Sequence, residues 1–335
     1  MALLASPSAF AAKEHPPRVV HVGAYLNQVH ALSLRDNNFE VDFYLWFRWD
    51  AVEWGERTEE ETTKPGAPVP AASTDEAQRL PFETFEIMGS IETTKEVQSR
   101  APGYAALRVK SKITEYWDVS RFPFDDHVLA IRVESIDQEE HLLRYELDQD
   151  NSGVGPELRV AGWAVGKPRM TLSTGEYRTN FGDLNLPTKN HSLYTRGTFE
   201  LPLHRRGWGS FLKLFGGLAV AVAVALTSYF IRAKEVDPRF GLCVGSLFAA
   251  VASQYVVASV LPESPTFTLA DRLHLVAFAV VLIGIVQSAV ALHYLSRDTE
   301  EDERLVQRLD RVTFALVTTL WLGVSALLVY QARAS

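Results

Sequence analysis

Residues 211–231 read FLKLFGGLAVAVAVALTSYFI, an apolar run that carries a single charge, Lys213, near its start. About 20 apolar residues in an α-helix cross a hydrocarbon core about 30 Å thick. A helix of a soluble bundle would carry a polar stripe, and residues 218–226 have none. Residues 207–335 are therefore predicted to form a transmembrane domain. Its expected helices span residues 211–231, 240–261, 273–295 and 312–330.

Basic residues gather in two of the three linkers between these runs. The connector at 262–268 has none. Because basic loops are retained in the cytoplasm, both basic linkers are expected there and residues 1–206 are expected outside. The basic residues are Arg232, Lys234 and Arg239 in the first linker and Arg297, Arg304, Arg308 and Arg311 in the other.

Residues 1–12 are mostly small and apolar and contain Ala9-Phe10-Ala11, which has the A-x-A form of a signal-peptidase site. The segment is short and has no basic residue, so we interpret it as the remnant of a signal peptide. A disordered tail is the alternative. A signal peptide agrees with an N-terminal part outside the cytoplasm.

The clearest strand pattern lies in residues 39–49, where large apolar side chains alternate with charged or amphipathic ones. Residues 127–136 alternate in the same way. Short alternating runs separated by turn residues favour an antiparallel sandwich. Residues 13–206 are therefore predicted to form an immunoglobulin-like β-sandwich domain, with a surface loop at 58–72. Further short strands are expected at 19–26, 85–88, 107–110, 142–145, 162–165, 177–181 and 197–203.

The composition argues against several classes of protein. The net charge of −8 argues against a nucleic-acid partner. The one cysteine, Cys243, lies inside an apolar run, so no intrachain disulfide can form. The sequence has no GxSxG, HExxH or P-loop motif, and His127, His191 and His204 are scattered. We therefore expect no enzyme activity, no metal site and no cofactor.

The segment Arg121-Phe122-Pro123-Phe124-Asp125 lies between two expected strands. With the alternating strand and the four apolar runs that follow it, and with Leu261-Pro262 after the second run, it resembles the pentameric ligand-gated ion channels of bacterial type. These belong to the Cys-loop receptor superfamily but lack the loop disulfide. The resemblance covers residues 19–330. It implies a homopentamer around a central pore in the inner membrane of a bacterial cell, surrounded by membrane lipid.

The first span departs from the family pattern. The family usually carries a proline midway along it, whereas residues 214–217 here read Leu-Phe-Gly-Gly. Glycine is therefore expected to supply the local bend.

The resemblance implies that the second apolar run lines the pore. Anchored on Leu261-Pro262, positions at alternating steps of three and four face the axis. Two large rings, Phe248 and Tyr255, would constrict this pore and stop ions by dewetting. The alternative for the glycines is a contact between packed helices. The predicted pore-lining residues are Asp237, Gly241, Gly245, Phe248, Ala252, Tyr255 and Ser259.

Asp237 would lie at the cytoplasmic mouth, with Glu235 close by. Five copies would form a ring of carboxylates, which favours permeant cations and repels anions. Arg239 lies near enough in the sequence to weaken the field of that ring. The alternative is that Asp237 is an ordinary exposed carboxylate in the linker, without a role in selectivity.

Transduction between the two domains is expected at their junction. The resemblance implies that the carboxylates of Asp36 and Asp125 bind the guanidinium of Arg205. Such an arginine–carboxylate cluster fixes the relative orientation of its side chains. Arg206 could replace Arg205. The connector that starts at Pro262 is expected to press against Phe124. The predicted coupling residues are Asp36, Phe122, Pro123, Phe124, Asp125, Arg205 and Pro262.

The resemblance also implies an agonist site between subunits, where aromatic rings hold a cationic amine by cation–π attraction. Ile136 stands where the family often has another aromatic residue. Protons, a divalent cation or another small molecule remain open as ligands. A pentameric binding protein that does not conduct, or a membrane-anchored enzyme, are the alternative functions. The predicted ligand-binding residues are Glu134, Phe181 and Tyr194, with Tyr44 from the neighbouring subunit.

Overall fold

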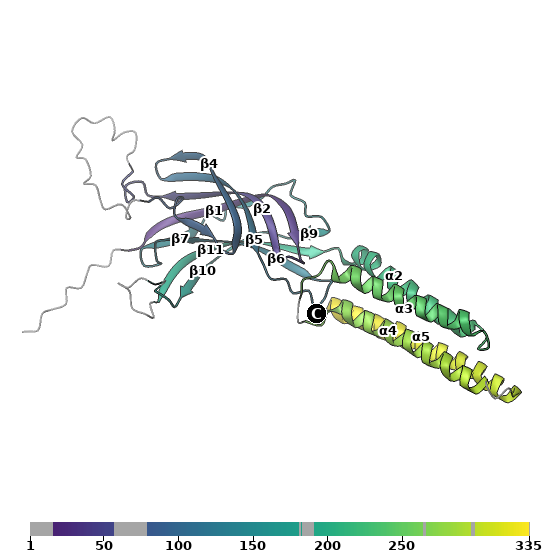
Figure 1. Cartoon of the computed structure of the whole chain (residues 1–335). Coiled ribbons are helices and arrows are strands. Elements are labelled where there is room, and N and C mark those ends of the chain that lie inside the picture. Colours follow the sequence, from purple (N-terminus) through teal and green to yellow (C-terminus); the bar gives the residue numbers. More distant parts are fainter. Residues whose placement is uncertain are drawn as a thin grey trace, which may run out of the picture.

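A computed structural model describes residues 16–56, 79–180, 182, 191–263, 266–295 and 299–334. A β-rich part comes first, and four long helices extend from one end of it (Figure 1). The predicted signal-peptide remnant at 1–12 and the predicted surface loop at 58–72 lie outside the described residues.

The larger sheet is built around the longest strand, β1. Its order is β4-β5-β2-β1-β7, and β8 also pairs with β1. Neighbours are antiparallel except β7 and β8, which run parallel to β1. The strands are β1 (Arg18–Ser33), β2 (Asn38–Trp49), β4 (Ser90–Ala101), β5 (Tyr104–Thr114), β7 (Leu143–Leu147) and β8 (Gly153–Val154).

The second sheet is antiparallel throughout. Its order is β10-β11-β6-β3, with β9 paired to β11. The long strand β11 leads directly into the first helix, so this sheet is continuous with the helical part. The strands are β3 (Phe85–Ile87), β6 (Asp126–Ser135), β9 (Trp163–Val165), β10 (Arg169–Tyr177) and β11 (Ser192–Arg205).

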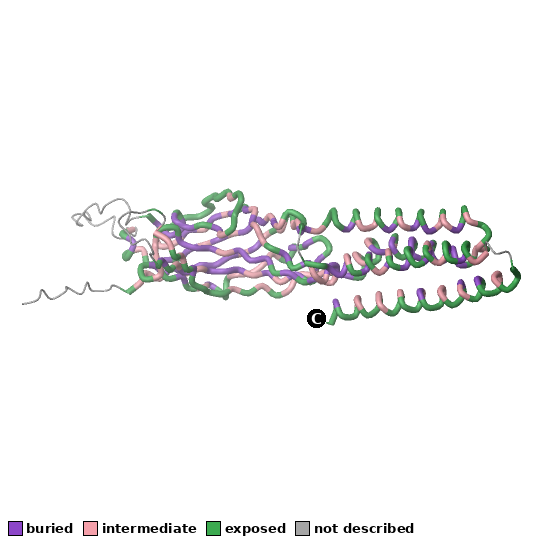
Figure 2. Tube along the Cα trace, turned by 60° about the horizontal axis from the view of Figure 1, so that its bottom comes forward, coloured by how far each residue is buried: buried purple, intermediate pink, exposed green. Residues whose placement is uncertain are grey.

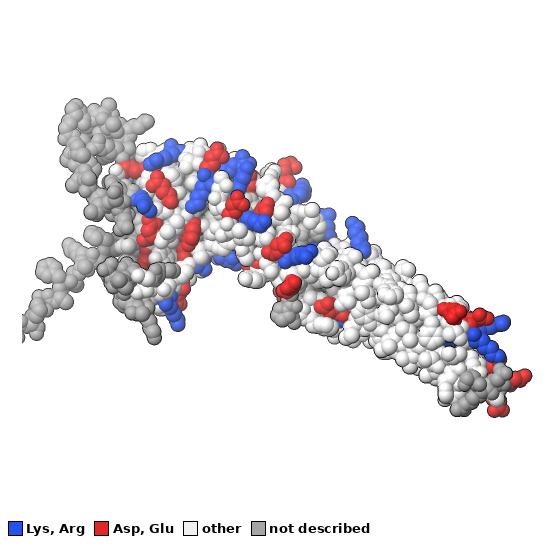
Figure 3. Space-filling view, in the orientation of Figure 1, with Lys and Arg blue, Asp and Glu red and all other residues white. Residues whose placement is uncertain are grey.

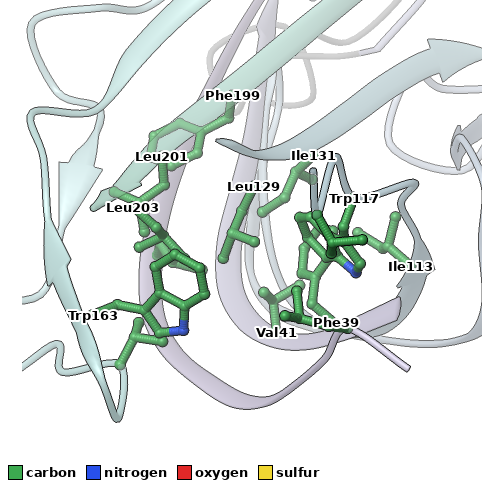
Figure 4. Close-up of a cluster of buried hydrophobic side chains, with 14 of the residues drawn as sticks. Phe39, Val41, Ile113, Trp117, Leu129, Ile131, Trp163, Phe199, Leu201 and Leu203 are labelled. Carbon is green, nitrogen blue, oxygen red and sulfur yellow. The ribbon is translucent and has the colours of Figure 1, made fainter. Parts of the chain in front are cut away.

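The core lies between the two sheets. Alternate residues of β2 point into it, and Phe39, Phe43, Leu45 and Phe47 are fully buried. Figure 4 shows side chains from β2, β6 and β11 converging with Trp117 and Trp163. The predicted β-sandwich is confirmed, and so is the inward face of residues 39–49.

Three strands were missed or misplaced from the sequence. β4 and the short β8 were missed, and β10 was expected at 177–181, whereas the structure ends it at Tyr177. Nearly every residue of β4 and most residues of β10 are exposed, so neither carries the apolar alternation that marks a half-buried strand.

Each of the four helices begins four or more residues before its predicted apolar run. α2 (Gly207–Thr227) ends in a short 3₁₀ turn, η1 (Ser228–Phe230), and is followed by α3 (Val236–Ala258), α4 (Leu269–Leu295) and α5 (Glu300–Ala334). At the start of α4, Thr268 and Asp271 each accept a hydrogen bond from the other's backbone N–H, at 3.2 Å and 2.9 Å, a reciprocal N-terminal cap.

The helices are those of a multi-pass membrane protein. All four are long and apolar enough to span a bilayer. Charged residues cover the sandwich and the far tips of the helices, and the shaft between them is nearly free of charge (Figure 3). Exposed residues recur along every helix in Figure 2, and many of them are leucine or valine.

Candidate functional site

One face of α3 is covered and the opposite face is not. α3 contacts α2 and α4. The seven predicted pore-lining residues, named here the α3 stripe, all lie on the exposed side, where Phe248 is 70% and Tyr255 is 80% exposed. The subunit therefore leaves the whole α3 stripe without a cover of its own. The covered side carries Arg239, Cys243, Ser246, Ala250 and Val257.

The two glycines of the α3 stripe make no close contact within the subunit. A Cβ built on Gly241 or Gly245 would meet nothing within 4 Å among the described residues. The helix-packing alternative for these glycines therefore does not apply inside one subunit. The wide space in front of them is compatible with a lumen.

Charge at the base of α3 is divided between its two faces. Asp237 is exposed on the α3 stripe, in the first turn of the helix. Arg239 is 1% exposed and donates to both carboxylate oxygens of Asp310 on α5, at 2.8 Å and 2.5 Å. The expectation that Arg239 weakens the field of Asp237 is corrected, because its charge is paired away from the stripe.

The junction contains a buried ionic cluster on β11 and β6. Arg205 donates to Asp125 through Nε at 2.7 Å and Nη2 at 3.0 Å, and the carboxylate is 1% exposed. The Nε2 atom of His127 lies 2.6 Å from the second Asp125 oxygen. The guanidinium also stacks on Trp163, 4.0 Å from the ring centroid, and lies over Phe122 at 5.0 Å.

Burial by itself would raise the pKa of Asp125. The hydrogen bonds from His127 and Arg205, together with the guanidinium charge, outweigh that effect and hold the pKa of Asp125 below its ordinary value. The carboxylate is therefore ionised at any pH near neutrality. Of the two candidate arginines, the structure places Arg205 in this cluster and leaves Arg206 exposed.

The β1–β2 hairpin reaches the helices by a different residue from the one expected. Asp36 accepts a hydrogen bond from Ser33 Oγ at 2.7 Å, so the structure does not bring it to Arg205. The neighbouring Arg35 instead donates to the carbonyl of Ser259, at the end of α3, at 3.4 Å. Asp36 and Arg205 both line a cavity of about 550 Å³ at the junction.

The Phe-Pro-Phe-Asp loop seats on the start of α2. Phe124 lies against Trp208 and Phe211, with ring centroids 5.5 Å and 5.6 Å away. A side chain at Gly207 would come within 2.6 Å of the Phe124 ring and 2.7 Å of the Pro123 carbonyl, so this close approach requires glycine. The end of the connector contacts the residues just before this loop. There, the backbone N–H of Leu269, the first residue of α4, donates to the carbonyl oxygen of Ser120 at 2.9 Å.

Two residues that the sequence analysis did not single out complete the candidate ligand site. Glu134 is 2% exposed and accepts hydrogen bonds from Arg196 Nε and the Tyr177 hydroxyl, both at 2.7 Å. Desolvation and the Glu134 charge raise the pKa of Tyr177 to about 12. Tyr194 packs edge-on against Tyr177, with centroids 5.7 Å apart. The Glu134 carboxylate is thus already matched by an arginine of its own subunit.

The remaining predicted ligand contacts are not gathered at this cluster. Tyr44 lies half-buried on β2, in the other sheet. Phe181 lies outside the described residues. Arg196 lies opposite Glu134 because of the register of β6 against β11. The spacing of these residues in the sequence does not predict their contact. Within the described residues, no group of three or more His, Cys, Asp or Glu side chains could hold a metal ion.

Comparison with known proteins agrees with this geometry. No family model matches the chain. The chain is similar to the proton-gated ion channel of Gloeobacter violaceus, with 20% identity over 318 residues that cover 91% of this chain and 81% of that protein. An alignment of that extent includes both the β-sandwich and the four helices, so the similarity to an ion channel, a kind of protein that is not an enzyme, extends over both parts of the chain.

Proposed function

We propose that five copies of this chain surround a pore lined by the α3 stripe and form a cation-selective channel gated from the extracellular side. The uncovered α3 stripe carries this proposal. A lipid-facing surface would be uniformly apolar, whereas this one combines glycines, two large aromatic rings and a carboxylate at one end.

Selectivity is assigned to a ring of Asp237 residues. Carboxylate rings attract cations and repel anions over distances of about the Debye length, about 8 Å at physiological salt. Asp237 is exposed, and the nearest arginine on the helix, Arg239, is paired with Asp310. The field of the ring is therefore not offset by that arginine.

The gate is assigned to Phe248 and Tyr255. They are the only large side chains on the α3 stripe, and both project from the exposed face of the helix. Rings of aromatic side chains bar ions mainly through the loss of hydration. A small movement of α3 would then be enough to change conduction.

Transduction is assigned to the junction. Arg205 and Asp125 join β11 to the Phe-Pro-Phe-Asp loop, and Phe124 of that loop packs on α2. Arg35 extends a second contact from the β1–β2 hairpin to the end of α3. A movement of either sheet therefore has a short mechanical route to the pore helix.

For the ligand, we propose extracellular protons. The Gloeobacter relative is proton-gated by name, and this sequence contains nine histidines. Histidine side chains change charge between about pH 5 and pH 8.

A cationic amine is the second candidate ligand. The edge-on pair of Tyr177 and Tyr194 is an aromatic surface of the kind that holds amines. Arg196 lies in the same cluster and already neutralises Glu134, which disfavours a cationic guest. The two ligands are separable by experiment.

The test is current recording from purified protein in liposomes. The external solution is stepped from about pH 7.5 to about pH 4.5, and separately a panel of primary amines is applied at constant pH. The proposal expects a cation current after the acid step. Ligand binding without current would support the non-conducting alternative, and the absence of current under every condition would contradict channel function.

A further inference from the structure

At the base of the pore helix, a buried ion pair joins three helices. Arg239 of α3 donates through Nη1 and Nη2 to the two oxygens of Asp310 on α5 and through Nε to Ser288 Oγ on α4, at 2.9 Å. The amide of Gln287 donates to the same carboxylate at 3.1 Å. We propose that Asp310 is a selectivity-determining residue, because it neutralises Arg239 and leaves the Asp237 ring as the charge that permeating ions meet. This inference rests on the proposed function.

The position of Arg239 gives its charge a direct effect on the pore mouth. Residues 237 and 239 are two steps apart on a helix, so they differ by about 3 Å along the axis and point to nearly opposite sides. Five unpaired arginines would surround the five carboxylates at almost the same level. In surroundings of low dielectric constant, such charges are screened far less than charges in water.

Other charges near the mouth are placed differently. Glu235 is exposed and precedes α3. Lys234 forms an ion pair with Glu303 at the start of α5, and both side chains are largely exposed. Arg232 and Arg311 line a cavity between η1 and α5 that Asp310 also lines. Solvent screens these groups, whereas Arg239 is 1% exposed and depends on Asp310 for its counter-charge.

Asp310 also stands out on its own helix. The buried residues of α5 are Val306, Asp310, Val317 and Ala332, so Asp310 is the one buried charge within the described part of α5. A residue needed only for docking this helix could be apolar, since well-packed apolar residues commonly replace buried ion pairs without loss of stability. The bidentate geometry instead fits the task of holding the charge of Arg239 away from the α3 stripe.

The experiment compares three variants with the wild type: Asp310→Asn, Arg239→Gln, and the double variant. Each is purified, checked for its oligomeric state, reconstituted in liposomes and activated. The cation-to-anion permeability ratio is then measured from the reversal potential in a salt gradient. Glu303→Gln is the matched control, because it removes a carboxylate from a largely exposed pair on the same helix.

The signs of the expected changes are opposite for the two single variants. Asp310→Asn leaves five uncompensated positive charges and should lower the permeability ratio by at least about twofold, the order expected for unit charges close to the mouth. Arg239→Gln leaves Asp310 as an additional negative charge and should keep or raise the ratio. The double variant and Glu303→Gln should match the wild type.

A purely structural role predicts another pattern. Both single variants would then assemble poorly, and whatever current remained would keep the wild-type ratio. Assembled Asp310→Asn channels with the wild-type ratio, or a fall in the ratio for Arg239→Gln, would overturn the inference. If Asp310→Asn does not assemble, a lowered permeability ratio in Arg239→Gln or in the double variant would still contradict the inference about Asp310.

Asp237→Asn separates this inference from the proposed function. If that variant keeps the wild-type ratio, the assignment of the filter to Asp237 fails. If Asp237→Asn lowers the ratio and Asp310→Asn does not, the filter stands and only the role of Asp310 is wrong.

Discussion

Buried charges of the β-sandwich are held by specific partners. Asp125 is paired with Arg205, and Glu134 with Arg196. The resemblance to the channel family implied Asp36, Asp125 and Arg205 as one cluster, with Arg206 as the alternative to Arg205. It did not include His127, because proximity between residues on different strands depends on sheet register and not on sequence spacing.

Replacement of Arg205 tests the junction cluster. Arg205→Ala leaves the Asp125 carboxylate buried without its bidentate partner, which costs about 3 kcal/mol or more. We expect pentamers to form and the activation threshold to shift strongly or activation to disappear. Arg206→Ala is the control, since Arg206 is exposed. Wild-type activation curves for assembled Arg205→Ala channels would remove the cluster from the gating mechanism.

The acid stability of the β-sandwich follows from its aspartates. Its Arg108 partner lowers the pKa of Asp42, and the pKa of Asp125 is lowered as described above. A carboxyl group with a depressed pKa stabilises the fold fully above its unfolded value of about 3.9 and loses that contribution as the pH falls through the folded value. For these two groups we therefore expect no loss of thermal stability between about pH 8 and pH 5, and a loss below about pH 4.

Circular dichroism melts across this range check the prediction. Acid activation at about pH 5 would then be a gating event of a folded protein. A melting temperature that falls in parallel with activation would show that acid unfolds the sandwich instead.

The elements of the chain were predictable to the extent that they are amphipathic or uniformly apolar. Residues 39–49 were identified because burial of alternate residues dictates their pattern, and the four apolar runs because a bilayer demands long apolar helices. β4 and β10 are exposed and were not. The α3 stripe was placed by helical period and by its distance from Leu261-Pro262, and the structure leaves that whole face uncovered.

The two aromatic rings of the α3 stripe give a prediction about the gate. Phe248→Ser lowers the dehydration barrier, so it should cause leak current or raise ligand sensitivity by about threefold or more. Tyr255→Ser should do so more weakly, because the tyrosine hydroxyl already offers some hydration. Val244→Ser, an exposed position off the stripe, is the control. Unaltered gating in well-assembled channels of both aromatic variants would contradict the assignment of the gate.

On the scale of the whole molecule, one subunit is incomplete. Its helices expose long apolar faces, and in the proposed function α3 contributes one wall of a lumen that further copies close. The order of domains and the number of spans followed from the sequence, because a bilayer demands long apolar helices. The partner surfaces could not be predicted, since they depend on which faces the tertiary fold leaves free.

Assembly is therefore a prediction of its own. Native mass measurement in detergent should give five times the 37.4 kDa chain mass. Closed rings of identical subunits need one interface repeated around the axis. A stable dimer or tetramer would contradict the pentamer and the pore geometry with it.

The most direct test of the account asks whether water and ions reach the α3 stripe. Cys243, the single cysteine, is buried and can be replaced by serine to give a thiol-free background. Gly245→Cys then puts a thiol on the stripe, and Ser246→Cys puts one on the covered face. A charged thiol reagent applied to activated channels should block current through Gly245→Cys, with recovery under reductant, and leave Ser246→Cys unaffected. No block at residue 245 despite normal currents, or block at residue 246 instead, would contradict a pore lined by this face of α3.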